Sequence, residues 1–337
     1  MQDLSLYDYE LPDDRIAQTP LEPRDAAKLL WLCRETGEIR HKRFSDLPDL
    51  LDEGDLLVLN DTRVTALRLN GRRTTGGGVE LLLLRQIEGT KYVALCKPAK
   101  RLRPGAEIEL SETLTATVLD DGGQGLKTLR LRCANDLEEE LSRVGRVPLP
   151  PYIHSSLPDA ERYQTIFARS PGSSAAPTAA LHFTAHLLDR LQSKGVQIAF
   201  VSLDIGLDTF RPIQSEQVED HTMHGELCRL PEKTADAIHG SRGRIVAVGT
   251  TAVRTLESFA VGPKRVESGE KETRLFIRPP YDFLVVDSII TNFHLPRTSM
   301  LLMVAAFAGR ERLMRAYAEA LCTEYRFLSF GDAMLVM

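Results

Sequence analysis

The sequence predicts an α/β protein: a layered α/β main domain with a largely parallel sheet, interrupted by a small antiparallel β domain. Three observations support this. Strand-like and helical patterns alternate after residue 148, as they do in α/β sheets. Short alternating strand patterns separated by glycine turns fill residues 62–135, with the regular spacing of an antiparallel barrel or sandwich. The length of 337 residues suits two domains, or one domain with an insertion.

The first part of the main domain covers residues 1–61 and ends in a predicted strand at 55–60. The run D-L-L-V-L-N is apolar enough to be buried on both faces, which is typical of a parallel strand. The inserted domain covers residues 62–147. Its expected strands lie at 64–69, 79–85, 92–96, 107–110, 115–119 and 126–132.

The second part of the main domain covers residues 148–337 and begins with a stiff P-L-P-P connector. The segment 262–273 is expected to be the one disorder-prone loop. Helices are expected at 185–194, 233–239, 251–259, 299–309 and 312–325, and strands at 196–203, 244–248, 283–289 and 332–336.

Charge is distributed unevenly along the chain. Residues 62–135 hold thirteen Lys and Arg against seven Asp and Glu, a net charge of +6 within a chain whose total is −5. A basic β domain in an acidic host is a candidate surface for nucleic-acid phosphates. Edge strands also carry Lys and Arg to prevent aggregation, so charge alone leaves both interpretations open.

Composition excludes several other classes. The five cysteines are scattered and form no C-x-x-C pair, so neither a disulfide framework nor a zinc knuckle is indicated. The acidic, polar start is unlike a signal peptide, and the longest apolar run, 300–308, is too short to span a bilayer. A cytoplasmic protein is expected. Neither a P-loop nor a dinucleotide-binding glycine motif follows a strand.

Polar, histidine-bearing segments are concentrated between residues 172 and 226. His182 follows a P-T-A-A-L segment, and His221, His224 and Glu226 lie together in D-H-T-M-H-G-E. Histidine titrates near neutral pH, which favours acid–base or hydrogen-bonding roles. The spacing is not the H-E-x-x-H of helical zinc sites, so no metal is predicted.

Two further segments follow predicted strands. The run 245–254 combines a strand, a glycine turn and a helix start, where Thr250, Thr251 and Arg254 could hold an anion or merely cap the helix. Asn292 and His294 follow another strand, and ligands of open α/β sheets bind beyond the carboxyl ends of strands.

Taken in order along the whole chain, these motifs resemble those of the S-adenosylmethionine:tRNA ribosyltransferase-isomerases of queuosine biosynthesis. The matching motifs are G-D-L-L-V-L-N-D-T-R-V (54–64), P-L-P-P-Y-I (148–153), A-A-P-T (175–178), L-H-F (181–183), D-H-x-M-H-x-E (220–226), V-G-T-T (248–251), N-F-H-L-P (292–296) and G-D-A-M (331–334).

The resemblance implies an α/β domain interrupted by a small β-barrel. It also implies an enzyme that moves the ribosyl part of S-adenosylmethionine onto 7-aminomethyl-7-deazaguanine at the tRNA wobble position. The product is epoxyqueuosine, and adenine and methionine are released. S-adenosylmethionine is then a substrate, no cofactor is needed, tRNA is the macromolecular partner, no membrane is involved and a monomer is expected.

The resemblance also suggests roles for particular residues. His182, His221, His224 and Glu226 are the expected catalytic residues, handling protons or sugar hydroxyls. Arg211, Thr250, Thr251 and Arg254 would hold the methionine carboxylate or the ribose. The full set of expected substrate-binding residues is Asn60, Asp61, Arg63, Thr178, Arg211, Thr250, Thr251, Arg254, Asn292, His294 and Asp332.

The chain departs from the family pattern near the expected site. Asp204 replaces a histidine, Asp208 and Ala180 replace glycines, and Arg297 replaces an acidic residue. Aspartate cannot act as a neutral imidazole at pH 7. Two alternatives therefore stand beside the main interpretation: a diverged paralogue with an altered S-adenosylmethionine or nucleoside substrate, and a tRNA-binding protein without catalysis.

Overall fold

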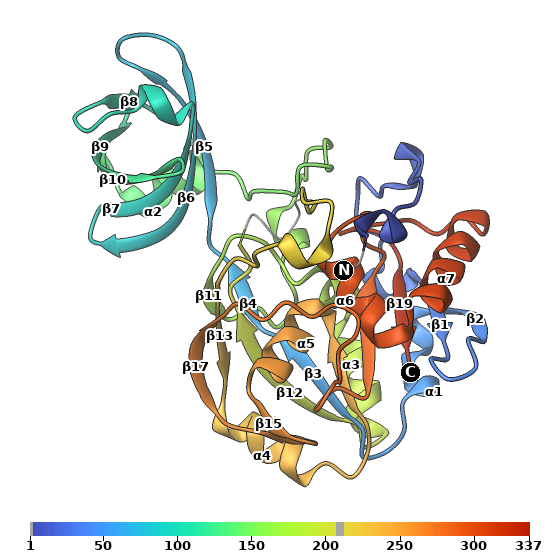
Figure 1. Cartoon of the computed structure of the whole chain (residues 1–337). Helices are drawn as coiled ribbons and strands as arrows, with labels where there is room; N and C mark the ends of the chain where they lie inside the picture. The colour runs from blue at the N-terminus through green and yellow to red at the C-terminus, as the bar shows by residue number, and fades with distance from the viewer. Residues whose placement is uncertain (1–2, 207–211) are drawn as a thin grey trace. The chain divides into compact units, whose positions relative to one another are not determined.

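The structure is a computed structural model that describes residues 3–206 and 212–337 (Figure 1). The chain forms two compact units. The main unit comprises Met1–Thr62, Pro150–Ser170 and Ala176–Met337, and the second comprises Arg63–Leu149 and Pro171–Ala175. The short strip 171–175 is part of the second unit although it lies outside the insertion expected at 62–147.

A nine-stranded sheet forms the centre of the main unit, in the order β17-β13-β12-β3-β14-β18-β19-β1-β2. The predicted α/β class is confirmed, and the sheet is mixed: β12, β3, β14 and β18 are mutually parallel, and antiparallel pairs flank them. The strands are β1 (Lys28–Leu32), β2 (Ile39–Arg43), β3 (Leu56–Asn60), β12 (Gln197–Leu203), β13 (Glu226–Leu230), β14 (Ile245–Val248), β17 (Gly269–Thr273), β18 (Ser288–Asn292) and β19 (Ala333–Val336).

Helices cover both faces of this sheet. Helix α3 (Ala185–Ser193) begins at Thr184, whose hydroxyl caps the Leu187 amide, and packs with Leu57 and Leu59 of β3 in one apolar cluster. Helix α5 (Gly249–Ser258) contacts β3, β12, β14 and β18 and is buried along most of its length. The other helices of this unit are α1 (Leu47–Leu50), α4 (Glu232–Gly240), α6 (Ser299–Ala308) and α7 (Arg310–Cys322).

None of the helices within the described ranges is both long and apolar enough to cross a membrane.

Two sequence-based expectations for this unit are wrong. The strand expected at 283–289 begins only at Ser288, because the amides of Leu284, Val285 and Val286 donate to the Glu257 carboxylate, at 3.0 to 3.1 Å, instead of to a neighbouring strand. The expected loop at 262–273 contains β17, which pairs with β13 at the edge of the sheet. The short strands β15 (Ala260–Gly262) and β16 (Arg265–Val266) form a separate hairpin before it.

The second unit is a closed barrel in the order β10-β7-β6-β5-β8-β9, as the resemblance predicts. All neighbouring strands of the barrel pair antiparallel, and alternate side chains fill one apolar core that also includes Leu141 of helix α2 (Leu137–Val144). Its strands are β5 (Leu67–Arg73), β6 (Gly78–Glu88), β7 (Lys91–Lys97), β8 (Glu107–Glu109), β9 (Leu114–Gly123) and β10 (Leu126–Cys133), and the short strands β4 (Thr62–Val64) and β11 (Ser170–Ser173) lie where the chain passes between units.

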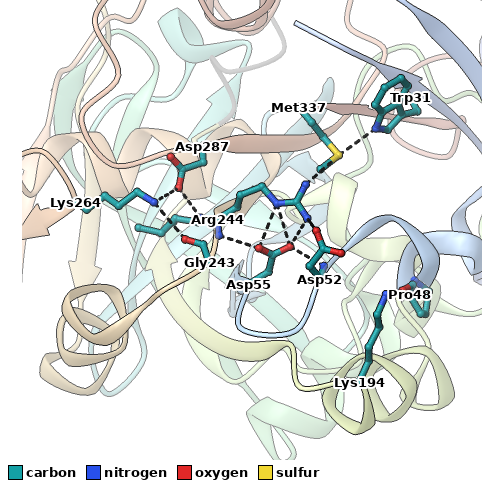
Figure 2. Close-up of polar contacts among 11 residues, drawn as sticks. Trp31, Pro48, Asp52, Asp55, Lys194, Gly243, Arg244, Lys264, Asp287 and Met337 are labelled. Carbon is teal, nitrogen blue, oxygen red and sulfur yellow. Dashed lines mark hydrogen bonds and ion pairs between the residues drawn. The ribbon is translucent and has the colours of Figure 1, made fainter. Parts of the chain in front are cut away.

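A network of polar contacts fastens the amino-terminal edge of the parallel strands (Figure 2). Asp55, just before β3, accepts hydrogen bonds from the Arg244 amide (2.8 Å) and guanidinium (2.6 Å). Asp52 also pairs with Arg244, and Asp287, just before β18, accepts from the Ile245 amide. These contacts fix the starts of β3, β14 and β18, and the loops at the opposite, carboxyl-terminal edge form the candidate site.

Candidate functional site

A cavity opens at the carboxyl-terminal edge of the parallel strands, between the ends of β14 and β18. Five of the residues predicted to bind substrate line it, although they come from three distant segments: Thr178, Thr250, Thr251, Asn292 and His294. This is the edge where ligands of open α/β sheets bind.

The turn from β14 into α5 contributes Gly249, Thr250 and Thr251 to the cavity lining. Gly249 has a φ of +83°, a left-handed conformation that suits glycine, and lets the chain turn directly into the helix. The Thr251 hydroxyl is buried and has no hydrogen-bond partner within residues 3–206 and 212–337. The α5 amino terminus and this hydroxyl therefore present unused hydrogen-bonding capacity to the cavity.

Asn292 is held by residues on both sides. The Thr178 hydroxyl donates to its Oδ1 at 3.0 Å, and its Nδ2 lies 3.4 Å from Nε2 of His182. Burial lowers the pKa of His182 to about 4, so the ring is neutral and Nε2 can accept this hydrogen bond. His182 itself lines a neighbouring cavity, and at this site it orients Asn292.

His294 lines the cavity as a neutral ring. Its Nε2 lies 2.8 Å from the Thr291 hydroxyl, and its backbone amide donates to the Tyr317 hydroxyl at 2.9 Å. The Tyr9 hydroxyl donates to its carbonyl oxygen. Burial lowers the pKa of His294 to about 3, which keeps the ring uncharged at neutral pH.

Glu226, the first residue of β13, is a buried carboxylate whose partners include Arg254, His224 and the Gly206 amide. Its Oε2 accepts from Arg254, and its Oε1 accepts from the Gly206 amide at 3.0 Å and lies 3.2 Å from His224 Nε2. Burial alone would raise the pKa of Glu226, but the His224 hydrogen bond and the Arg254 charge outweigh it and lower the pKa. Glu226 is therefore ionised and able to accept a proton.

Arg254 is less open to a ligand than its sequence position suggested. Its Nε donates to the Leu275 carbonyl, and its Nη2 donates to the carbonyls of His224 and Thr273, each at 3.0 Å. With the Glu226 pair, most of its donors bind the protein itself. Arg254 and Glu226 line a second cavity, which shares Thr250, Thr251 and Met300 with the first.

His221 lies beside this second cavity. Its ring packs edge-on against Phe276, which lines that cavity, with 5.2 Å between the ring centroids. Burial, followed by the charge of His224, lowers the pKa of His221. His224 therefore contacts Glu226 directly, whereas His221 senses the charge of His224 and packs against Phe276.

Asp204 lies close to the same carboxylate. Its Oδ1 accepts a hydrogen bond from the Thr62 hydroxyl at 3.1 Å, and its backbone amide donates to Leu227. Burial raises the pKa of Asp204, and the negative charges of Glu270 and Glu226 add to that rise. Asp208 and Arg211 lie outside the described residues.

Four other predicted binding residues do not line either cavity. Asn60 Nδ2 donates to the Leu203 carbonyl, and its Oδ1 accepts from the Leu203 amide. Asp61 accepts hydrogen bonds from the Ser202 hydroxyl and from Arg169, each at 2.6 Å. Asp332 accepts from the amides of Lys28 and Arg326. Arg63 begins the second unit, in β4.

Sequence reasoning missed three polar residues of the first cavity, Tyr152, Thr291 and Ser329. The hydroxyls of Tyr152 and Ser329 lie 2.7 Å apart, and both residues line the cavity wall. Tyr152 belongs to the P-L-P-P-Y-I motif, whose signal was interpreted as a connector.

Within the described ranges, no group of three or more His, Cys, Asp or Glu residues is placed to hold a metal ion.

Together these features define a class: an α/β protein with an inserted β-barrel and two joined cavities at the carboxyl ends of its parallel strands, lined by hydroxyl and amide groups and by the buried Glu226–Arg254 pair. The family model described as queuosine biosynthesis protein matches residues 4–336. The chain belongs to that family.

Relatives of known name match along the whole chain. An S-adenosylmethionine:tRNA ribosyltransferase-isomerase from Symbiobacterium thermophilum is 48% identical over 99% of both chains. One of the same name from Staphylococcus saprophyticus is 46% identical, over 99% of this chain and 100% of its own. The crystal structure of S-adenosylmethionine tRNA ribosyltransferase from Thermotoga maritima is similar with a TM-score of 0.57 and 38% identity, covering 99% of this chain and 100% of its own.

Proposed function

We propose that this protein is an S-adenosylmethionine:tRNA ribosyltransferase-isomerase. It moves the ribosyl part of S-adenosylmethionine onto 7-aminomethyl-7-deazaguanine at the tRNA wobble position, forms epoxyqueuosine and releases adenine and methionine. S-adenosylmethionine is a substrate, and no cofactor takes part. The reaction occurs in the cytoplasm, and the protein acts as a monomer.

One observation carries this proposal beyond family membership. Motif residues from four distant segments converge on two joined cavities that contain an ionised carboxylate and a helix amino terminus. These are the groups that the two halves of S-adenosylmethionine need: a base for its acidic C–H bond and a binding site for its carboxylate.

The sulfonium makes the neighbouring ribose C5′–H acidic, so a positioned base can generate an ylide that expels adenine. Glu226 is the best-placed base, because Arg254 and His224 keep it ionised inside the protein. His224 Nε2, 3.2 Å from Oε1, helps to hold this carboxylate in place. Thr250, Thr251 and the first amides of α5 would hold the methionine carboxylate.

The barrel is the proposed partner surface for part of the tRNA. Residues 62–135, which make up most of that unit, carry the net charge of +6, which favours contact with phosphates.

The test is to incubate the pure protein with S-adenosylmethionine and tRNA bearing 7-aminomethyl-7-deazaguanine. Adenine is followed by chromatography and the modified nucleoside by mass spectrometry. The proposal predicts epoxyqueuosine and adenine in equal amounts. Binding of tRNA without either product would overturn it in favour of a binding protein.

A further inference from the structure

A third cavity, also lined by polar side chains, lies directly beside the first cavity of the candidate site. We call it the arginine cavity. It meets the first cavity at Ser329, which lines both, and at the contact between Asn292 of the first cavity and His182 of the arginine cavity. Its polar lining includes Arg24, Arg162, His182, Arg326 and Ser329.

Three guanidinium groups line this cavity, and none of its lining residues is an aspartate or glutamate. The nearest carboxylates compensate only in part. Glu22 pairs with Arg162 at 2.6 Å, but its side chain is 77% exposed to solvent. Asp332 lies 4.0 Å from Arg326, beyond hydrogen-bond distance. Because His182 is neutral, the cavity carries an excess of positive charge.

Arg24, unlike Arg162, makes its hydrogen bonds to neutral backbone carbonyls, although the carboxylates of Glu22, Asp159 and Glu161 lie near enough to offset part of its charge. Arg24 donates to the carbonyls of Gln164 (2.8 Å), Glu161 (3.1 Å) and Leu181 (3.3 Å). Burial lowers the pKa of Arg24, and the charge of Arg162 lowers it further, so two like charges face one another there.

Arg326 supplies an unused donor at the same place. Its Nη2 atom is buried and has no hydrogen-bond partner in the described part of the chain. A buried charged donor without an acceptor is costly, and a bound oxyanion would remove that cost. Guanidinium groups match phosphate oxygens in geometry and charge.

An open groove continues from this cavity. Leu21 and Arg326 line both, and the groove adds Lys28, Lys42 and Arg43, the last two exposed on the edge strand β2. Asp46, Glu324 and Asp332 also line it. Basic side chains in the groove outnumber these three carboxylates only slightly, but a groove that continues from an anion site suits a chain of phosphates better than a single small carboxylate.

We propose that the arginine cavity binds a backbone phosphate of the tRNA, next to the nucleotide that enters the neighbouring cavity. This inference rests on the proposed function, since it names the part of the substrate that a further site holds. The phosphate would accept hydrogen bonds from Arg326 and Arg162 and would set the register of the anticodon loop.

The test uses the full-length variants Arg326→Gln and Arg162→Gln. The control is Arg242→Gln: Arg242 is exposed and precedes β14, at the amino-terminal edge of the parallel strands. We expect KM for tRNA to rise about tenfold in each cavity variant, because each loses a charge-assisted hydrogen bond. KM for S-adenosylmethionine should stay unchanged. Arg326→Lys, which keeps the charge, should raise KM for tRNA less than Arg326→Gln does.

Direct binding separates this inference from the proposed function. Filter binding of the tRNA anticodon stem–loop is measured at several salt concentrations. Each cavity variant should lower the slope of log affinity against log salt by about 0.7, the value for one phosphate contact in a single strand. That result would support the phosphate site even if the wild type formed no epoxyqueuosine.

Three results would overturn the inference. The first is an unchanged KM and salt slope in the two cavity variants. The second is an equal effect of Arg242→Gln, which would indicate non-specific electrostatics. The third is a rise in KM for S-adenosylmethionine alone, which would assign the cavity to the methionine carboxylate.

Discussion

Replacing Glu226 with glutamine would remove the negative charge of a buried pair and leave its size almost unchanged. Only 4% of each side chain of the Glu226–Arg254 pair is exposed, so water cannot replace the lost charge. Breaking a buried pair costs about 3–5 kcal/mol, because the remaining ion is uncompensated. Arg254 keeps three carbonyl acceptors, so we expect the lower end, about 3 kcal/mol.

Thermal unfolding followed by circular dichroism measures this loss. A destabilisation of about 3 kcal/mol should lower Tm by about 6–12 °C in a unit of this size. Arg254→Met should cost a similar amount. The double variant Glu226→Gln/Arg254→Met should be more stable than the sum of the two losses predicts, with a coupling energy of about 2 kcal/mol or more.

Additive losses in the double variant would refute this reasoning, since they would show that the two charges do not stabilise each other. The same substitution should reduce kcat for ribosyl transfer by at least a hundredfold, because glutamine cannot accept the proton. Normal turnover by Glu226→Gln would remove Glu226 from the chemistry.

Three further predictions concern other parts of the main unit. Thr251→Val should leave Tm nearly unchanged, because the hydroxyl has no partner to lose, but should raise KM for S-adenosylmethionine about tenfold in steady-state kinetics; a stability loss with normal KM would contradict this. Burial would raise the pKa of Asp55, but its hydrogen bonds to Arg244 outweigh this and lower it, so its stabilisation is complete above the unfolded pKa near 3.8 and disappears as pH falls through the folded pKa. Asp55→Asn should therefore lower the free energy of unfolding by about 2 kcal/mol at pH 7 and make that free energy fall less steeply with pH below pH 4. Denaturation of the variant at several pH values that gave the wild-type dependence on pH would contradict this. Asp204→His should lower ribosyl transfer about tenfold, because Thr62 loses its carboxylate acceptor and keeps only the longer contact to the Ser170 carbonyl; a rise in turnover would show that the aspartate impairs the enzyme.

The sequence predicted the elements that depend on local pattern. The strand, glycine turn and helix at 245–254 are local features, and the structure contains β14 and α5 there. Thr251 reaches the cavity because its place at the helix start is fixed by that turn. The sequence could not show that Arg254, one turn further on, is buried against Glu226, Thr273 and Leu275, since those partners come from distant strands and loops.

Polar residues at strand ends were the least predictable from sequence. Asn60 and Asp332 look like ligands in a motif, yet both satisfy backbone groups of neighbouring segments. The strand expected at 283–289 was misplaced for a similar reason, because the Glu257 side chain takes the amides that a ladder would use. Such competition between a side chain and a strand depends on tertiary packing.

The site itself is tested most directly by a crystal structure of the protein with S-adenosylmethionine bound. We predict electron density in the joined cavities, with an oxygen of the ligand within hydrogen-bond distance of the Thr251 hydroxyl and the ribose facing Glu226. Density at another location, with these cavities empty at saturating ligand, would contradict the proposed site.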